Sequence, residues 1–245
     1  FEIFDGPQPL FAAIRRREID RVFNLLHGPD GEDGSLQGAL QLMGVPVTGA
    51  NMPASALTMD KIRSKWIWER NGFLTPPFEY FGADQHDYQR ALDKLGLPVF
   101  VKPTGLGSSI GISRVVDAAE LLPAVELARQ YGSTIIIEAE IRGGEYFAGV
   151  LDRLMLPLIR IETPRAFYDY EAKYESDDTR YFCPCGLGAD EEEKLKTLSL
   201  RAFEILGTSG WGRVDFLLDE SGAPWFLEVN TTPGMTDHSL VPQAA

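Results

Sequence analysis

Apolar and polar positions alternate most regularly near the end of the chain. Residues 211–218 alternate and are rich in apolar side chains, residues 219–222 (DESG) are polar, and residues 223–229 return to an apolar, alternating pattern. Alternation with period two is typical of a strand that is buried on one face, and a short polar stretch with glycine is typical of a turn. We therefore predict a β-hairpin in this part of the chain.

A strand, a glycine-rich loop and a helix are predicted near the beginning of the chain. Residues 19–27 (IDRVFNLLH) have the pattern of a buried strand, residues 28–34 form a polar loop, and residues 35–43 suit a helix that Ser35 would cap. This succession is the unit of an open α/β domain, whose sites lie at the carboxyl ends of the strands. His27 would lie at such an end, although a lone histidine is more often structural.

The other segments with a regular period alternate between helix and strand, so we predict a protein of the α/β (α+β) class. The apolar residues of the last long helix recur at helical spacing, which indicates a core element without a direct function. The predicted helices cover a short stretch within residues 1–18 and residues 53–71, 84–95, 117–131 and 190–206. The predicted strands cover residues 46–49, a segment that begins at 78, and residues 98–102, 112–116 and 134–139.

The composition is that of an ordinary globular protein. The chain has 245 residues, 44% hydrophobic and 24% charged, which is enough for two or three small domains. It has no apolar run long enough to cross a bilayer and no signal-peptide pattern, so we expect no membrane partner. The net charge of −13 argues against nucleic acid as a partner. An anionic substrate would have to be met by local lysines and arginines.

Two cysteines, Cys183 and Cys185, are separated by a single proline. Two thiols alone cannot complete a tetrahedral zinc site, and so close a pair makes a poor structural disulfide. We therefore expect reduced thiols and a cytoplasmic location.

Oxygen-bearing side chains gather on the predicted hairpin. Glu228 and Asn230 are two residues apart, so they project from one face of the second strand, and Asp215 can meet them from the first. Two carboxylates and an amide offer only hard oxygen ligands, which suits Mg²⁺ held jointly with substrate phosphates. Arg213 shares the face of Asp215 and would place a fixed cation beside the metal. Any one of these residues could belong to an ordinary charged face, but four together favour a site.

Lys102 ends a predicted strand, and the loop of residues 103–111 that follows is rich in glycine and serine. Glycines allow consecutive N–H groups to point at an anion, and serines add hydroxyl donors. The lysine precedes the glycines and no GK[ST] closes the loop, so this is not a P-loop. A loop of this kind is by itself a weak signal, but the lysine at its mouth strengthens the case for phosphate binding.

The ordered motifs of the chain resemble those of a known family. Residues 212–215 (GRVD) with 227–235 (LEVNTTPGM) resemble the metal-binding end of an ATP-grasp ligase, and residues 236–242 resemble specifically the D-alanine–D-alanine ligases. The resemblance extends from about residue 27 onward. It implies an ATP-grasp fold with an N-terminal open α/β (pre-ATP-grasp) domain. The implied division is a remnant of the N-terminal substrate domain over 1–50, a central subdomain over 51–138 and a C-terminal subdomain over 139–245.

The same resemblance implies the ligands and the residues that meet them. The ligands are ATP, Mg²⁺ or Mn²⁺ as two ions, and D-alanine, with a monovalent cation as a further candidate. The implied ATP-binding residues are Lys61, Lys102, Ser108, Glu138, Ala139, Ile141, Glu145 and Lys173. Those implied for the substrate are His27, Tyr174, Arg213, Gly234, Ser239 and Leu240, and those for the metal are Asp215, Glu228 and Asn230. The implied catalytic residues are Arg213, Gly234, Ser108 and Tyr174.

Within this set, the lysines would meet the phosphates, Glu138 the adenine amino group and Glu145 the ribose. The long loop of residues 165–185 would be a lid that carries Lys173 and Tyr174. One departure from the family concerns Glu140, which stands where several relatives carry an aromatic side chain. This substitution weakens the expectation that the adenine ring is stacked there.

The implied activity is the ATP-dependent ligation of two D-alanine molecules through an acyl phosphate, for peptidoglycan precursors, by a cytoplasmic homodimer. The family begins with a strand, a glycine-rich loop and a glutamate, and ends with a helix, which this sequence lacks. We therefore expect either a fragment or a chain of joined segments, with a junction between residues 1 and 19.

Two alternatives stay open. One is a ligase of the same fold with D-lactate or D-serine as its second substrate, and the other is a non-catalytic nucleotide-binding module. Tyr174, in place of phenylalanine, argues against D-lactate. The presence of Asp215, Glu228, Asn230 and Arg213 together argues against a module that has lost its chemistry.

Overall fold

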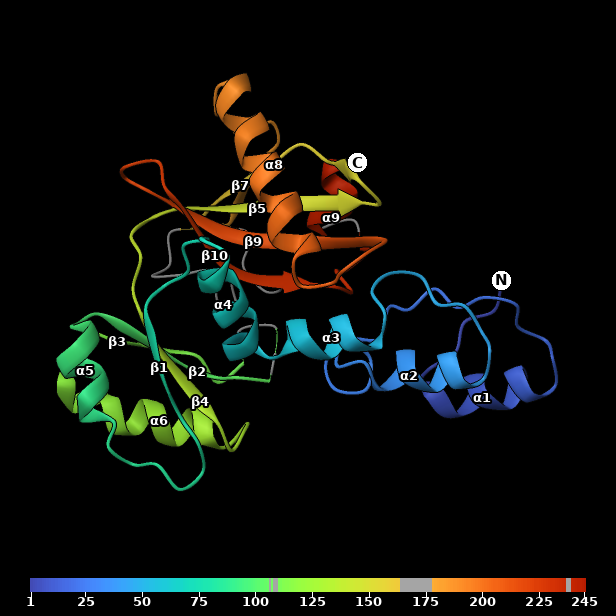
Figure 1. The fold of residues 1–245 in the computed structure, drawn as a ribbon, viewed down its shortest axis with the longest axis horizontal. Coiled ribbons are helices and arrows are strands. Elements are labelled where there is room, and N and C mark those ends of the chain that lie inside the picture. Colours follow the sequence, from blue (N-terminus) through green and yellow to red (C-terminus); the bar gives the residue numbers. More distant parts are fainter. Residues whose placement is uncertain (106, 108–109, 164–177, 237–238) are drawn as a thin grey trace.

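The chain builds two antiparallel sheets and a helical N-terminal lobe, which the computed structural model describes over residues 1–105, 107, 110–163, 178–236 and 239–245. Figure 1 shows the N-terminal lobe at one end of the molecule and helix α4 between the two sheets. The N-terminal helices are α1 (Pro7–Arg15), α2 (Ser35–Leu42), α3 (Met52–Met59) and α4 (Lys61–Arg70). This mixture of helices and sheets confirms the predicted fold class.

The four-stranded sheet has the order β1-β4-β2-β3. Its strands are β1 (Phe78–Phe81), β2 (Val99–Pro103), β3 (Ser113–Val115) and β4 (Ile135–Ala139). Helix α5 (Gln89–Leu95), the 3₁₀ turn η1 (Ala118–Glu120) and helix α6 (Leu121–Arg129) complete this part. The two helices cover one face of the sheet, where β-branched and aromatic side chains of the strands form a core with them (Figure 1). The opposite face is left to line a cavity.

The larger sheet has the order β10-β9-β5-β7-β8, with β6 paired to β5. Its strands are β5 (Gly143–Leu151), β6 (Leu154–Met155), β7 (Ile159–Glu162), β8 (Arg180–Phe182), β9 (Trp211–Asp219) and β10 (Pro224–Asn230). Helix α8 (Ala189–Glu204) packs on this sheet, and α9 (Leu240–Ala244) lies near the end of the chain. The predicted hairpin is therefore confirmed as β9 and β10.

Helix α8 confirms the prediction of a core helix. Leu195, Ala202 and Leu206 are buried in one cluster with aromatic residues of α4 and β10. The indole Nε1 of Trp68 on α4 donates to the carbonyl of Ala202 over 3.0 Å, so the hydrogen bond ties α4 to α8. In the described ranges, no helix is both long and apolar enough to cross a membrane.

The strands predicted at residues 19–27 and 46–49 are wrong. These segments meet only through a single parallel bridge between Val22 and Val47. Phe23 and Leu25 remain 52% and 41% exposed, although the ring of Phe23 stacks on Trp211 of β9 with 5.4 Å between the ring centres. A run of apolar residues cannot by itself supply the neighbouring strand that a strand needs for its hydrogen bonds.

Two predicted helices also differ from the structure, one by a break and one by a later start. The helix expected over 53–71 is broken at Asp60, which adopts an extended conformation (φ −87°, ψ 98°) and accepts a hydrogen bond from the N–H of Arg63 as the N-cap of α4. The helix expected over 84–95 begins only at Gln89. The strands β5, β6, β7 and β8 were not predicted, and β8 lies within residues 165–185, which were expected to be a long loop.

Candidate active site

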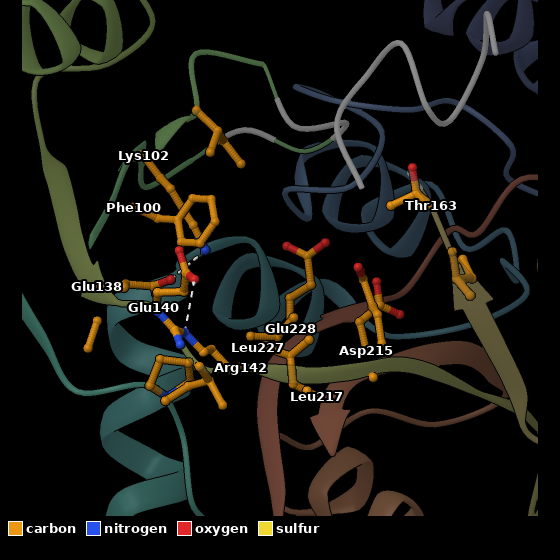
Figure 2. A pocket seen from close by; sticks show the side chains of 18 of the residues that line it. Phe100, Lys102, Glu138, Glu140, Arg142, Thr163, Asp215, Leu217, Leu227 and Glu228 are labelled. Atoms are coloured by element: carbon orange, nitrogen blue, oxygen red, sulfur yellow. Dashed lines mark hydrogen bonds and ion pairs between the residues drawn. The ribbon is translucent and has the colours of Figure 1, made fainter. Parts of the chain in front are cut away.

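A cavity of about 530 Å³ lies between the two sheets. Its walls come from β2 and β4 on one side, from β5, β7, β9 and β10 on the other, and from the start of α4 (Figure 2). It brings together residues that are far apart in the sequence. The predicted site residues that line it are Lys61, Lys102, Glu138, Ala139, Ile141, Glu145, Asp215 and Glu228.

Two carboxylates meet at one end of this cavity. Asp215 on β9 and Glu228 on β10 are register partners, because a bulge between Phe226 and Glu228 inserts Leu227 into the second strand. The bulge allows the consecutive residues Leu227 and Glu228 both to line the cavity. Figure 2 shows the Asp215 and Glu228 side chains projecting from the two strands toward the same open space.

Arg213 and Asn230 form a cross-strand pair of the hairpin two positions further along, beyond the pair Val214 and Val229. The Nε and Nη2 atoms of Arg213 donate to the two carboxylate oxygens of Asp215 over 2.6 and 2.7 Å. The guanidinium also lies 4.9 Å from the ring centre of Phe147, so its position is held from two sides. The Oδ1 atom of Asn230 accepts a hydrogen bond of 2.9 Å from the N–H of Thr232 and thereby shapes the turn after β10.

Lys61 stands at the first turn of α4, with its Nζ 3.3 Å from a carboxylate oxygen of Glu228. This places a cation beside the two carboxylates. In the described part of the chain, no three Asp, Glu, His or Cys side chains form a metal-binding group. The predicted set of two carboxylates and one amide is consistent with this result, since an amide is not among those residue types.

Glu32 is a residue of this region that sequence reasoning missed. Its carboxylate accepts a 2.6 Å hydrogen bond from the N–H of Gly28. Burial raises the pKa of Glu32, the N–H of Gly28, His27 and Lys61 oppose the rise, and Glu228 adds to it. The polar loop of residues 28–34 therefore reaches the carboxylate end of the cavity. The sequence feature that could have indicated Glu32 is an acidic residue in the polar loop after a predicted buried strand.

Glu138 occupies the other end of the cavity and is only 2% exposed. Lys102 donates a hydrogen bond to its Oε2, and the Nζ of Lys65 lies 3.0 Å from its Oε1. Burial would raise the pKa of Glu138, but the two lysines outweigh burial and lower the pKa to about 2. Within the described residues, Oε1 makes this ion pair but has no hydrogen-bond partner in favourable geometry.

Near Glu138, residue 140 is a charged glutamate where several relatives carry an aromatic residue, and a different residue supplies an aromatic ring. Glu140 is held by Arg114, whose Nη2 lies 3.1 Å from it, and by Arg142 at 4.0 Å. Phe100 on β2 is the register partner of Glu138 and lines the cavity beside it (Figure 2). An aromatic face is therefore present, but it comes from the neighbouring strand.

The turn after β10 brings another predicted pair together. A β-carbon on Gly234 would lie 2.7 Å from the Oγ of Ser239, so only glycine fits this approach. The Oγ of Ser239 accepts a 2.9 Å hydrogen bond from the N–H of Thr236. Leu240 begins α9 and is buried.

Several predicted residues lie beside the cavity or outside the described structure. His27 is exposed, and its Nδ1 lies 2.8 Å from the carbonyl of Leu25. The described part of the cavity wall does not include His27, Arg213, Asn230, Gly234, Ser239 or Leu240. Ser108, Lys173 and Tyr174 lie outside the described residues.

Comparison with known proteins gives consistent results over the chain. The family described as D-ala D-ala ligase C-terminus matches residues 67–245, and the family described as D-ala D-ala ligase N-terminus matches residues 5–50. The D-alanine–D-alanine ligase of Methylococcus capsulatus is 54% identical over 100% of this chain and 79% of its own length.

Solved structures of similar proteins have the same fold. The D-alanine–D-alanine ligase from Bacillus anthracis complexed with ATP has a TM-score of 0.83 and 34% identity, over 96% of this chain and 76% of that one. The VanG D-Ala:D-Ser ligase from Enterococcus faecalis has a TM-score of 0.83 and 35% identity, over 93% of this chain and 68% of that one.

Proposed function

The chain belongs to the D-alanine–D-alanine ligase family, and we propose that its cavity performs the ATP-dependent joining of two D-alanine molecules for peptidoglycan precursors. The observation that carries this proposal is the pair of chemically different ends in one cavity. A buried carboxylate stands at one end, and two further carboxylates with a lysine stand at the other. This arrangement suits a molecule with a hydrogen-bond donor at one end and a metal-bound phosphate chain at the other.

The nucleobase would bind at the Glu138 end. Glu138 is a buried carboxylate at this end, and ionised oxygens can accept further hydrogen bonds besides those from Lys65 and Lys102, so one of them would accept from the amino group of adenine. Backbone groups of Ala139 and Ile141 would meet the ring edge beside the face of Phe100, and Glu145 would bind the ribose. Use of ATP is consistent with the ATP complex of the Bacillus anthracis relative.

The phosphates would extend from there toward Asp215 and Glu228. Lys61 and Lys102 both line the cavity and would bind phosphate oxygens, together with Ser108 and Lys173. Asp215, Glu228 and Asn230 offer oxygen ligands for two Mg²⁺ or Mn²⁺ ions, which would neutralise phosphate charge. A monovalent cation could add to this charge balance.

The reaction follows from the poor reactivity of a carboxylate toward an amine. The γ-phosphoryl group of ATP would pass to the carboxylate of the first D-alanine, which releases ADP and forms an acyl phosphate. The amine of the second D-alanine would attack that carbonyl, and phosphate would leave as the peptide bond forms. Arg213 and the N–H of Gly234 would stabilise the oxyanion.

The remaining predicted residues would position the second substrate. Ser239 and the N–H of Leu240 would bind the carboxylate of the second D-alanine, because the turn at Gly234 brings Ser239 close and Leu240 comes next in the chain. Tyr174 and His27 would border the substrate. We further propose that the protein acts in the cytoplasm as a homodimer, with its domains divided near residues 50 and 138.

Release of phosphate by the purified protein tests the proposal. We expect release only when ATP, Mg²⁺ and D-alanine are present together, with D-alanyl-D-alanine as the product. Release with ATP alone would show hydrolysis without ligation and would contradict the proposal, and no release under any condition would favour a non-catalytic nucleotide-binding module. The similarity to the VanG ligase keeps D-serine as the second candidate for the second substrate, so the assay includes D-alanine mixed with D-serine or D-lactate.

A further inference from the structure

Lys65 is a lysine in the interior, 1% exposed. Burial lowers the pKa of its amine, and the adjacent Glu138 carboxylate opposes this and favours the ammonium. It belongs to α4, the helix between the two sheets (Figure 1), and it is not among the described residues that line the cavity. Its Nζ donates to the Oγ1 of Thr75 over 2.6 Å and lies 3.0 Å from Glu138. Thr75 in turn donates to the carbonyl of Phe226 over 2.8 Å. Lys65 therefore contacts Glu138 of the four-stranded sheet directly and is linked through Thr75 to β10 of the larger sheet.

The two lysines that hold Glu138 differ in what they can reach. Lys102 lines the cavity, with 16% of its side chain exposed, so it can turn to a bound phosphate. Lys65 is buried, and its Nζ contacts Glu138, Thr75 and the ring of Phe78, whose centre is 5.6 Å away, so Glu138 is the charged group that it pairs with. Once ATP draws Lys102 to its phosphates, Lys65 is the cation that stays with Glu138. A buried carboxylate without a cation would take up a proton.

We propose that Lys65 is a positioning residue that keeps Glu138 a charged acceptor during turnover and thereby makes the cavity select adenine over guanine nucleotides. Adenine presents an amino group to such an acceptor, whereas guanine presents a carbonyl oxygen at the same ring position. An ionised carboxylate can only accept hydrogen bonds, but a protonated one can also donate to that carbonyl. This inference rests on the proposed use of ATP.

Other charged groups surround this pair, and several already have partners. Lys61 is paired with Glu228, and Glu140 is held by Arg114. The β1 residue opposite Glu138 is Phe78, which carries no charge. The charged groups that face the pair from α4, β2 and the cavity are Lys61, Glu69, Lys102, Glu140, Arg142, Glu145, Arg160, Glu162, Asp215 and Glu228. Apart from Lys102, none of these forms an ion pair with Glu138 in the described structure.

The variant Lys65→Met tests the inference through nucleotide preference and its pH dependence. With saturating D-alanine and Mg²⁺, KM for ATP and the ratio of kcat/KM for ATP and GTP are measured from pH 6 to 9. In the variant we expect KM for ATP to rise as the pH falls, and the ATP:GTP ratio to drop about tenfold, which is the value of one hydrogen bond to a charged group. Lys196→Met, which removes a lysine paired with Glu192 on α8, is the control and should change neither.

An unchanged ATP:GTP ratio, or a KM for ATP with the same pH profile as the wild type, would overturn the inference. A failure of the wild type to ligate D-alanine with ATP would instead overturn the proposed function. If Lys65→Met does not fold, the variant K65M/E138Q replaces the pair by neutral side chains of similar size. We expect it to lose the preference for ATP with no new pH dependence of KM, and a fully retained preference would again refute the role of Lys65.

Discussion

The ion pairs of Glu138 should make the protein lose stability in acid by a definite amount. Burial acts to raise the pKa of Glu138, but Lys102 and Lys65 outweigh it and lower the pKa from 4.5 to about 2. A carboxyl group with a lowered pKa stabilises the folded state above its unfolded pKa, and the stabilisation disappears as the pH falls toward the folded value. The difference is worth roughly 3 kcal/mol at neutral pH, of which about 1–2 kcal/mol is lost between about pH 6 and pH 3.5.

Urea unfolding of the wild type and of K65M/E138Q at these two pH values measures this loss. All other carboxyl groups are shared, so their titration cancels when the two free energies of unfolding are subtracted. We expect the wild type to lose about 1–2 kcal/mol relative to the double variant on acidification, because only the wild type carries a titrating group at residue 138. A difference that stays constant within about 0.3 kcal/mol would refute the conclusion that Glu138 is ionised and paired in the folded protein.

Three further predictions address the site and the fold. Glu228→Gln removes a charge from the proposed metal site, so we expect turnover to fall about 100-fold or more with an unchanged circular dichroism spectrum, whereas Glu220→Gln in the exposed turn should retain activity. Tyr174→Phe should begin to accept D-lactate, most visibly at low pH, and formation of dipeptide alone at every pH would count against Tyr174 as the selector. Gly212→Ala would place a β-carbon 2.7 Å from a buried phenylalanine ring and should lower the free energy of unfolding by about 1–3 kcal/mol, while Gly188→Ala, with open space around it, should be nearly neutral by urea unfolding.

The parts of this protein that the sequence determines by itself depend on neighbours along the chain. The hairpin of β9 and β10 follows from alternation and a polar turn, and the shared face of Glu228 and Asn230 follows from their spacing of two. Helix α8 is predictable because its apolar stripe is a local property. The family motifs likewise lie in short, continuous stretches.

Other elements were missed because tertiary contacts decide them. Strand β5 is buried along most of its length, between β9 and β7, so its sequence lacks the alternation that identifies a half-buried strand. Residues 19–27 have the apolar content of a buried strand but gain only one bridge, because strand formation and burial depend on which segments lie beside them. A pattern of side chains along the chain indicates which residues could be buried, but it does not determine whether another segment packs against them.

The electrostatic arrangement of the site depends on the tertiary structure alone. Lys65 belongs to a helix with many charged residues, KIRSKWIWER, and nothing in this sequence distinguishes it from a lysine in water. Packing of α4 between the sheets buries it and places it 3.0 Å from Glu138, which is 73 residues away in the chain. The pKa of Glu138 is therefore a property of the packed molecule, because both its desolvation and its two cations come from segments remote in sequence.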